Sequence, residues 1–156
     1  MTGLPTDLTK EINRLLDLGR MDDVAVILRD ALKSGSAEAM FLSSSYGSQE
    51  ESIEEFEARS LSQVMLSADM GYAPAQFRLG TYFLFGDFVG VDVDRAEQCF
   101  KSAAGSGYPP AMYEYGLALL KGASAGDSRV EAMSWIARAA EAGDDHAAGF
   151  LAGIGD

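Results

Sequence analysis

Histidine and cysteine, two residue types that often perform catalysis or hold a metal ion, each occur once in this sequence. His146 is the only histidine, and it directly follows Asp144 and Asp145. Histidines that bind metal usually have further His, Cys or carboxylate ligands at suitable spacing, and no such set accompanies His146. Aspartates in this position are instead typical of helix N-caps. We therefore expect His146 at the start of a helix, and we predict no metal site.

Cysteine usage and motifs give no further sign of an enzyme. Cys99 is the only cysteine, so an internal disulfide is impossible, and a reducing, cytoplasmic location is predicted. The chain has no phosphate-binding G-x-x-x-x-G-K-[ST] loop. We predict no catalytic residues and no cofactor. An enzyme that uses a pair of the many carboxylates is kept as an alternative.

A run of acidic residues interrupts the first half of the chain, at Glu50, Glu51, Glu54, Glu55 and Glu57. One interpretation is a surface that contacts a partner rich in lysine and arginine. The other, which the sequence favours, is an acidic first turn of a helix, stabilised by the helix dipole. Glu50, Glu51, Glu54 and Glu55 are kept as candidate partner-binding residues.

The whole chain is acidic, with 24 Asp and Glu, 12 Lys and Arg and a formal net charge of −12. Nucleic acids and anionic membranes require clustered Lys and Arg, so neither is an expected partner. A basic protein is the favoured partner, although the charge could serve solubility alone. The N-terminus lacks the basic and apolar regions of a signal peptide, and no apolar run approaches the ~20 residues that span a bilayer.

The chain repeats itself. Gly35, Gly71, Gly107 and Gly143 are spaced 36 residues apart, and a fixed period of about 20 to 50 residues indicates a solenoid. Apolar residues with helical spacing recur in the second half of two units, at Ala96, Cys99, Phe100, Ala103 and Ala104 and again at Ala132, Trp135, Ile136, Ala139 and Ala140. Gly80 and Gly116 lie at equivalent positions of the predicted first helices, where we expect a neighbouring helix to approach closely.

These residues fit the pattern A-x-x-x-L-G, then G-x-x-V-x-x-D-x-x-[KR]-A, then A-A-x-x-G. An aromatic residue, Tyr82, follows the first part soon after. The remaining matches are Ala75, Leu79, Gly80, Gly86, Val89, Asp92, Arg95, Ala96, Ala103, Ala104 and Gly107. The chain thereby resembles the Sel-one-like repeat (SLR) family, a relative of the tetratricopeptide repeat. The resemblance implies an all-α, right-handed α-solenoid of helix-turn-helix units, an α-α superhelix that acts as an adaptor between proteins.

We predict one solenoid domain over residues 1–156. Its expected parts are a divergent N-terminal helix pair or cap (1–35), a divergent repeat (36–71), two regular repeats (72–107 and 108–143) and a C-terminal capping helix (144–156). The 36–71 unit is divergent because Ser44 and Glu50 replace the glycines of the pattern.

The predicted function is non-catalytic protein–protein interaction on the concave face, which the resemblance implies is lined by the first helices. Equivalent positions of those helices give the candidates Met40, Gln76 and Met112; Phe41, Phe77 and Tyr113; and Ser45, Thr81 and Leu117. The aromatic positions suit the core as well as a contact. The alternative function is an immunity protein or inhibitor that neutralises a basic toxin or effector. The sequence makes no prediction of the oligomeric state.

Overall fold

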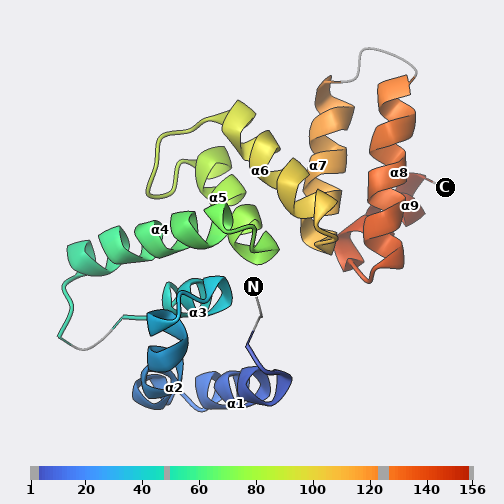
Figure 1. Cartoon of the computed structure of the whole chain (residues 1–156). Helices are drawn as coiled ribbons and strands as arrows, with labels where there is room; N and C mark the ends of the chain where they lie inside the picture. Colours follow the sequence, from blue (N-terminus) through green and yellow to red (C-terminus); the bar gives the residue numbers. More distant parts are fainter. Residues whose placement is uncertain (1–3, 48–49, 123–126, 155–156) are drawn as a thin grey trace. The chain divides into compact units, whose positions relative to one another are not determined.

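The protein is all-α in a computed structural model that describes residues 4–47, 50–122 and 127–154 (Figure 1). This confirms the predicted fold class. The helices of the described residues are α1 (Thr6–Asp17), α2 (Met21–Lys33), α3 (Ala37–Ser43), α4 (Ile53–Asp69), α5 (Ala73–Phe85), α6 (Val93–Gly105), α7 (Pro109–Gly122), α8 (Asp127–Glu141) and α9 (Asp145–Ile154). None of them is both long enough and apolar enough to cross a membrane.

The chain forms two compact units, Met1–Ala75 and Gln76–Asp156. Helices α1 to α4 belong to the first unit, and α6 to α9, with most of α5, belong to the second. Within the second unit, α7 and α8 run side by side as a hairpin (Figure 1). The single solenoid domain over 1–156 stays a prediction.

The evenly spaced glycines end helices, as the sequence predicts. All four have a left-handed backbone, with φ of 75° at Gly35, 85° at Gly71, 86° at Gly107 and 95° at Gly143. After α8, the N–H of Gly143 donates to the carbonyl oxygen of Ala140, and the N–H of Asp144 donates to that of Ala139, both at 3.0 Å. This pair of bonds is the Schellman motif, which satisfies the last carbonyls of a helix and turns the chain toward the next one.

Gly80 and Gly116 mark the close approaches that the sequence predicts. A Cβ atom at Gly116 would lie 2.6 Å from Cγ1 of Ile136 and 3.0 Å from the carbonyl oxygen of Ala132, so the backbone of α8 itself is close. A Cβ atom at Gly80 would lie 2.6 Å from Cε1 of Phe100. The neighbours of Gly80 are therefore side chains of α6, not its backbone.

Each unit has its own core. Ile12, Leu15, Val24, Leu28 and Ala39 form the core of the first unit. The predicted stripes of α6 and α8 are buried in the second unit at Ala96, Phe100, Ala103, Ala104, Ala132, Ile136 and Ala139. Small alanines on these faces let the helices pack closely, as a stacked repeat requires.

Candidate functional site

His146 lies at a helix start, as expected. The Asp144 carboxylate oxygen Oδ1 accepts a hydrogen bond of 2.8 Å from the N–H of Ala147 and so caps α9. The His146 ring lies over that of Tyr113, with 6.3 Å between ring centroids and 18° between planes. Among the described residues, no group of three or more His, Cys, Asp or Glu side chains is arranged to hold a metal ion.

A G-x-S-x-G string, the pattern of a hydrolase nucleophile elbow, occurs at residues 122–126. Such an elbow joins a strand to a helix, whereas the elements on either side of this string are the helices α7 and α8. Residues 123–126 lie outside the described part of the chain. The structural context therefore differs from that of the hydrolase motif.

The predicted aromatic contact residues take part in packing within their own unit. Phe41 meets Tyr72 edge to face, at 5.4 Å between ring centroids. Phe77 contacts Phe100 at 5.6 Å and Tyr108 at 5.5 Å. These rings hold neighbouring helices together. Only the part of each ring that is still exposed can contact a partner.

The other first-helix candidates differ in exposure. Met112 is buried. Ser45 is exposed and lies past the end of α3, so its predicted place on a first helix is wrong. The hydroxyl of Thr81 donates a 2.7 Å hydrogen bond to the carbonyl oxygen of Arg78 in its own helix. The remaining positions are partly buried: Met40, Gln76, Thr81, Tyr113 and Leu117. Their contact with a partner stays a prediction.

The acidic run begins α4. Ser52 and Glu55 form a capping box, in which the Ser52 hydroxyl accepts from the N–H of Glu55 at 3.2 Å and Glu55 Oε2 accepts from the N–H of Ser52 at 2.9 Å. Glu54 and Glu55 both stand in the first turn. The helix-start interpretation is therefore confirmed for these two residues, while a role in binding stays a prediction.

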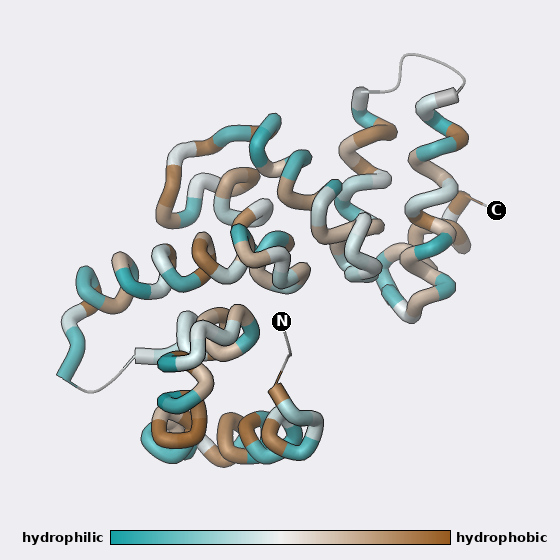
Figure 2. The backbone as a smooth tube through the Cα atoms, in the orientation of Figure 1, coloured by the Kyte–Doolittle hydropathy of each residue, from teal (hydrophilic) through white to brown (hydrophobic). Residues whose placement is uncertain are grey.

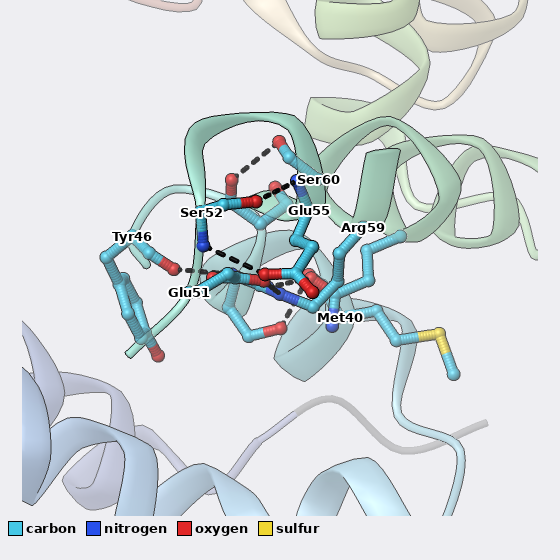
Figure 3. Close-up of polar contacts among 10 residues, drawn as sticks. Met40, Tyr46, Glu51, Ser52, Glu55, Arg59 and Ser60 are labelled. Carbon is cyan, nitrogen blue, oxygen red and sulfur yellow. Dashed lines mark hydrogen bonds and ion pairs between the residues drawn. The ribbon is translucent and has the colours of Figure 1, made fainter. Parts of the chain in front are cut away.

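Arg59 ties this acidic segment to α4 and to the end of α3 (Figure 3). Its Nε and Nη2 donate to the two carboxylate oxygens of Glu51, at 2.7 and 2.8 Å. Nη1 also donates to the carbonyl oxygen of Ser43 and to Gln63 Oε1, and Nη2 to the carbonyl oxygen of Tyr46. All five N–H donors of the guanidinium are thus used. The hydrogen bonds to Glu51 raise the pKa of Arg59 above its usual value.

A cleft of about 560 Å³ opens beside this network, within the first unit. One wall comes from α2 and is apolar except for Asp22, and the other carries Glu50, Glu51 and Glu55. The lining residues that define the cleft are Met21, Asp22, Ala25, Leu28, Leu32, Ser43, Tyr46, Gly47, Glu50, Glu51, Glu55, Arg59 and Gln63. Burial raises the pKa of the Tyr46 phenol to about 12, so this side chain is neutral over the physiological range.

Sequence reasoning found three of the cleft carboxylates but neither Arg59 nor the α2 wall. Arg59 and Glu51 are eight positions apart, with Glu51 in the connection before the helix, so no helical spacing links them. A bend of the chain brings the two together. The only signal in the sequence was an arginine that follows a dense run of glutamates.

The connection between α5 and α6 exposes apolar side chains in the second unit. Phe85 is 69% exposed, Phe88 45%, Val91 66% and Val93 59%. Phe88 has a φ of 60°, in the left-handed region that residues other than glycine rarely adopt, and its ring lies 4.8 Å from that of Tyr82. Figure 2 shows brown, hydrophobic stretches along this connection. We call Phe85, Phe88, Val91 and Val93 the apolar connection.

Burial also changes the pKa of one carboxyl group of α7, and this change predicts that stability depends on pH. Desolvation raises the pKa of Glu114 above its usual value. A raised carboxyl pKa means that the folded state holds this proton more tightly, so stability is fully present below the unfolded pKa and is lost as pH rises through the folded pKa. We expect Glu114→Gln to increase the free energy of unfolding at pH 7 and to have no such effect near pH 4. Urea unfolding at both pH values measures the difference, and exposed Glu141→Gln in α8 is the control.

Comparisons with known proteins agree with the repeat. The Sel1 repeat profile matches residues 73–108 and 109–144, one residue later than the units read from the glycine spacing. The crystal structure of a Sel1 repeat protein from Oxalobacter formigenes is similar, with a TM-score of 0.70 and 27% identity over 80% of this chain and 93% of that one. A search of the curated proteins gave no match.

A second similar structure is c5321, a protective antigen present in uropathogenic Escherichia coli strains that displays an SLR fold. It has a TM-score of 0.64 and 27% identity over 77% of this chain. The matched region is only 26% of that longer protein.

Proposed function

Residues 73–144 of this chain are two Sel1 repeats, and on that premise we propose that the protein is a non-catalytic module that binds another protein in the cytoplasm. Sel1 repeats generally serve as protein–protein interaction modules. A stack of helix pairs supplies a wide surface for a macromolecule.

The observation that carries the proposal is the apolar connection, which lies inside the first Sel1 repeat. Clustered exposed apolar side chains on a soluble domain mark surfaces that contact other proteins. Phe88 also holds a backbone conformation that is unfavourable for a phenylalanine, and such strain is often retained where a side chain must be presented. The predicted concave-face contact through Thr81 and Leu117, on helices α5 and α7, belongs to the same proposal.

Affinity capture with paired variants tests this proposal. We expect Phe88→Ser combined with Val91→Ser to reduce capture of the partner at least tenfold, because the contact loses its apolar anchors. Val130→Ser is the control, since Val130 is 71% exposed but lies on α8, outside the apolar connection. Equal capture by the wild type and the double variant would remove the apolar connection from the interface. Loss of capture with Leu117→Ser alone would assign the contact to the first helices.

The alternative function is an immunity protein that occludes a basic toxin or effector. The net charge of −12 supports it, because opposite charges accelerate the encounter of two proteins. Its distinguishing property is an association rate that falls steeply with ionic strength and that Phe88→Ser combined with Val91→Ser leaves unchanged, whereas an adaptor that binds through the apolar connection loses its partner in that variant.

A further inference from the structure

We propose that the cleft of the first unit binds a segment of the partner protein in which a lysine or arginine stands next to an apolar residue. The cleft lies in residues 21–63, outside the two Sel1 repeats. The inference rests on the proposed function, since it names a second contact for the same partner and the chemistry that this contact recognises.

The volume and the apolar wall of the cleft suit a peptide segment. A cavity of 560 Å³ is within the range of about 300 to 1,000 Å³ that binding sites have, and is larger than one side chain needs. Met21, Ala25, Leu28 and Leu32 form the α2 wall, and Leu28 is fully buried in the core of the unit. The wall is therefore fixed, and it offers a surface for an apolar side chain or for the methylene stem of a lysine.

The charge of the cleft selects a cation. Asp22, Glu50, Glu51 and Glu55 line it, against the single positive charge of Arg59. Arg59 already donates all its N–H groups to acceptors of its own unit, so it has no donor left for an anionic ligand. An incoming lysine or arginine meets complementary charge, and an acidic segment meets repulsion.

Two of the four carboxylates are engaged within the protein, and two are not. Glu51 pairs with Arg59, and Glu55 accepts from the N–H of Ser52. Asp22 and Glu50 are exposed and make no hydrogen bond or ion pair with any residue in the described ranges 4–47, 50–122 and 127–154. These two carboxylates are the groups that we assign to the cationic side chain.

The walls of the cleft are held in place before any partner arrives. In Figure 3 the Arg59 guanidinium faces the Glu51 carboxylate, beside the Ser52–Glu55 cap. The Ser60 hydroxyl adds a 2.7 Å hydrogen bond to the carbonyl oxygen of Ser44. A preformed site lowers the entropy that is lost on binding, so a short peptide can bind measurably without the rest of the partner.

The test uses the full chain and a fluorescein-labelled hexapeptide, Gly-Leu-Lys-Leu-Lys-Gly, followed by fluorescence anisotropy. We expect saturable binding, which Asp22→Asn combined with Glu50→Gln weakens about tenfold. The control is Glu57→Gln combined with Asp69→Asn, which removes the same charge from exposed sites of the same unit outside the cleft lining. It should weaken binding less than twofold. Ala25→Lys, at an exposed position of α2, should block the cleft with a cation of its own and leave the melting temperature unchanged.

Several results would overturn the cleft assignment. If the two double variants weaken peptide binding equally, the loss is explained by the change in net charge and not by the cleft. Displacement of the peptide by an equal concentration of spermidine would show that the site recognises a polyamine and not a protein segment. Peptide binding that does not saturate, or that Ala25→Lys leaves intact, would also refute it. If the protein partner is still captured through the apolar connection in any of these cases, the proposed function stands and only the cleft assignment fails.

Discussion

Replacing Arg59 by methionine is expected to lower the free energy of unfolding by about 3 kcal/mol, because four groups, one of them the side-chain oxygen of Gln63, lose their donors at once. The other three are the carboxylate of Glu51 and the carbonyl oxygens of Ser43 and Tyr46. The side chains of Arg59 and Glu51 are 34% and 15% exposed, so water replaces the lost bonds only in part. Urea denaturation followed by circular dichroism measures the change.

Arg14→Met is the matched control. Arg14 contacts both carboxylate oxygens of Glu11 at 2.9 and 2.8 Å, the same geometry as the Arg59 pair, but the two side chains are 60% and 40% exposed. An exposed pair of this kind contributes less than about 1 kcal/mol, so we expect little loss. Similar losses in the two variants would contradict the structural role of Arg59.

Substitution of Gly116 by alanine is expected to lower the free energy of unfolding by about 2 kcal/mol. On its own, alanine is better than glycine in a helix by about 1 kcal/mol. The new methyl group, however, would lie 3.0 Å from the Ala132 carbonyl oxygen, which cannot rotate away, and 2.6 Å from buried Ile136. Helices α7 and α8 must move apart to admit it. Thermal and urea unfolding report the loss.

Gly149→Ala is the control, and we expect it to raise the free energy of unfolding instead of lowering it. Gly149 lies within α9, and a Cβ atom there would have no atom within 4 Å, so alanine should stabilise the helix by up to about 1 kcal/mol. At Gly80 the neighbour is the Phe100 ring, so Gly80→Ala should be partly rescued by Phe100→Leu. If Gly116→Ala proves as stable as Gly149→Ala, α7 does not pack as closely on α8 as in the structure.

The repeat could be read from the sequence because its signals are local. A glycine after a helical stripe predicts a left-handed turn, and an aspartate after that glycine predicts the next helix. Gly143 and Asp144 show both, since the first has a φ of 95° and the second caps α9. Neither prediction needs knowledge of distant residues, and the glycine signal recurs at the same spacing along the chain.

The candidate site was predictable only in part. The sequence aligned the three first-helix segments, yet it did not show that Met112 is buried or that Ser45 lies past the end of α3 and is exposed. The sequence likewise identified Glu51 as a candidate contact residue but did not show that it pairs with Arg59. Burial and pairing depend on which faces of the helices meet, and a single sequence does not record this directly.

The amino-acid sequence by itself determined the helix-turn-helix period, the helix ends and the net charge of this protein, because each follows from residue type and spacing along the chain. Only the tertiary structure decided three properties: all N–H donors of Arg59 are used within the protein, α2 and the acidic segment line one cleft, and the Phe88 side chain is exposed. The physical reason is that these properties arise where segments distant in the sequence come together, and there the packing of side chains sets exposure and hydrogen bonding.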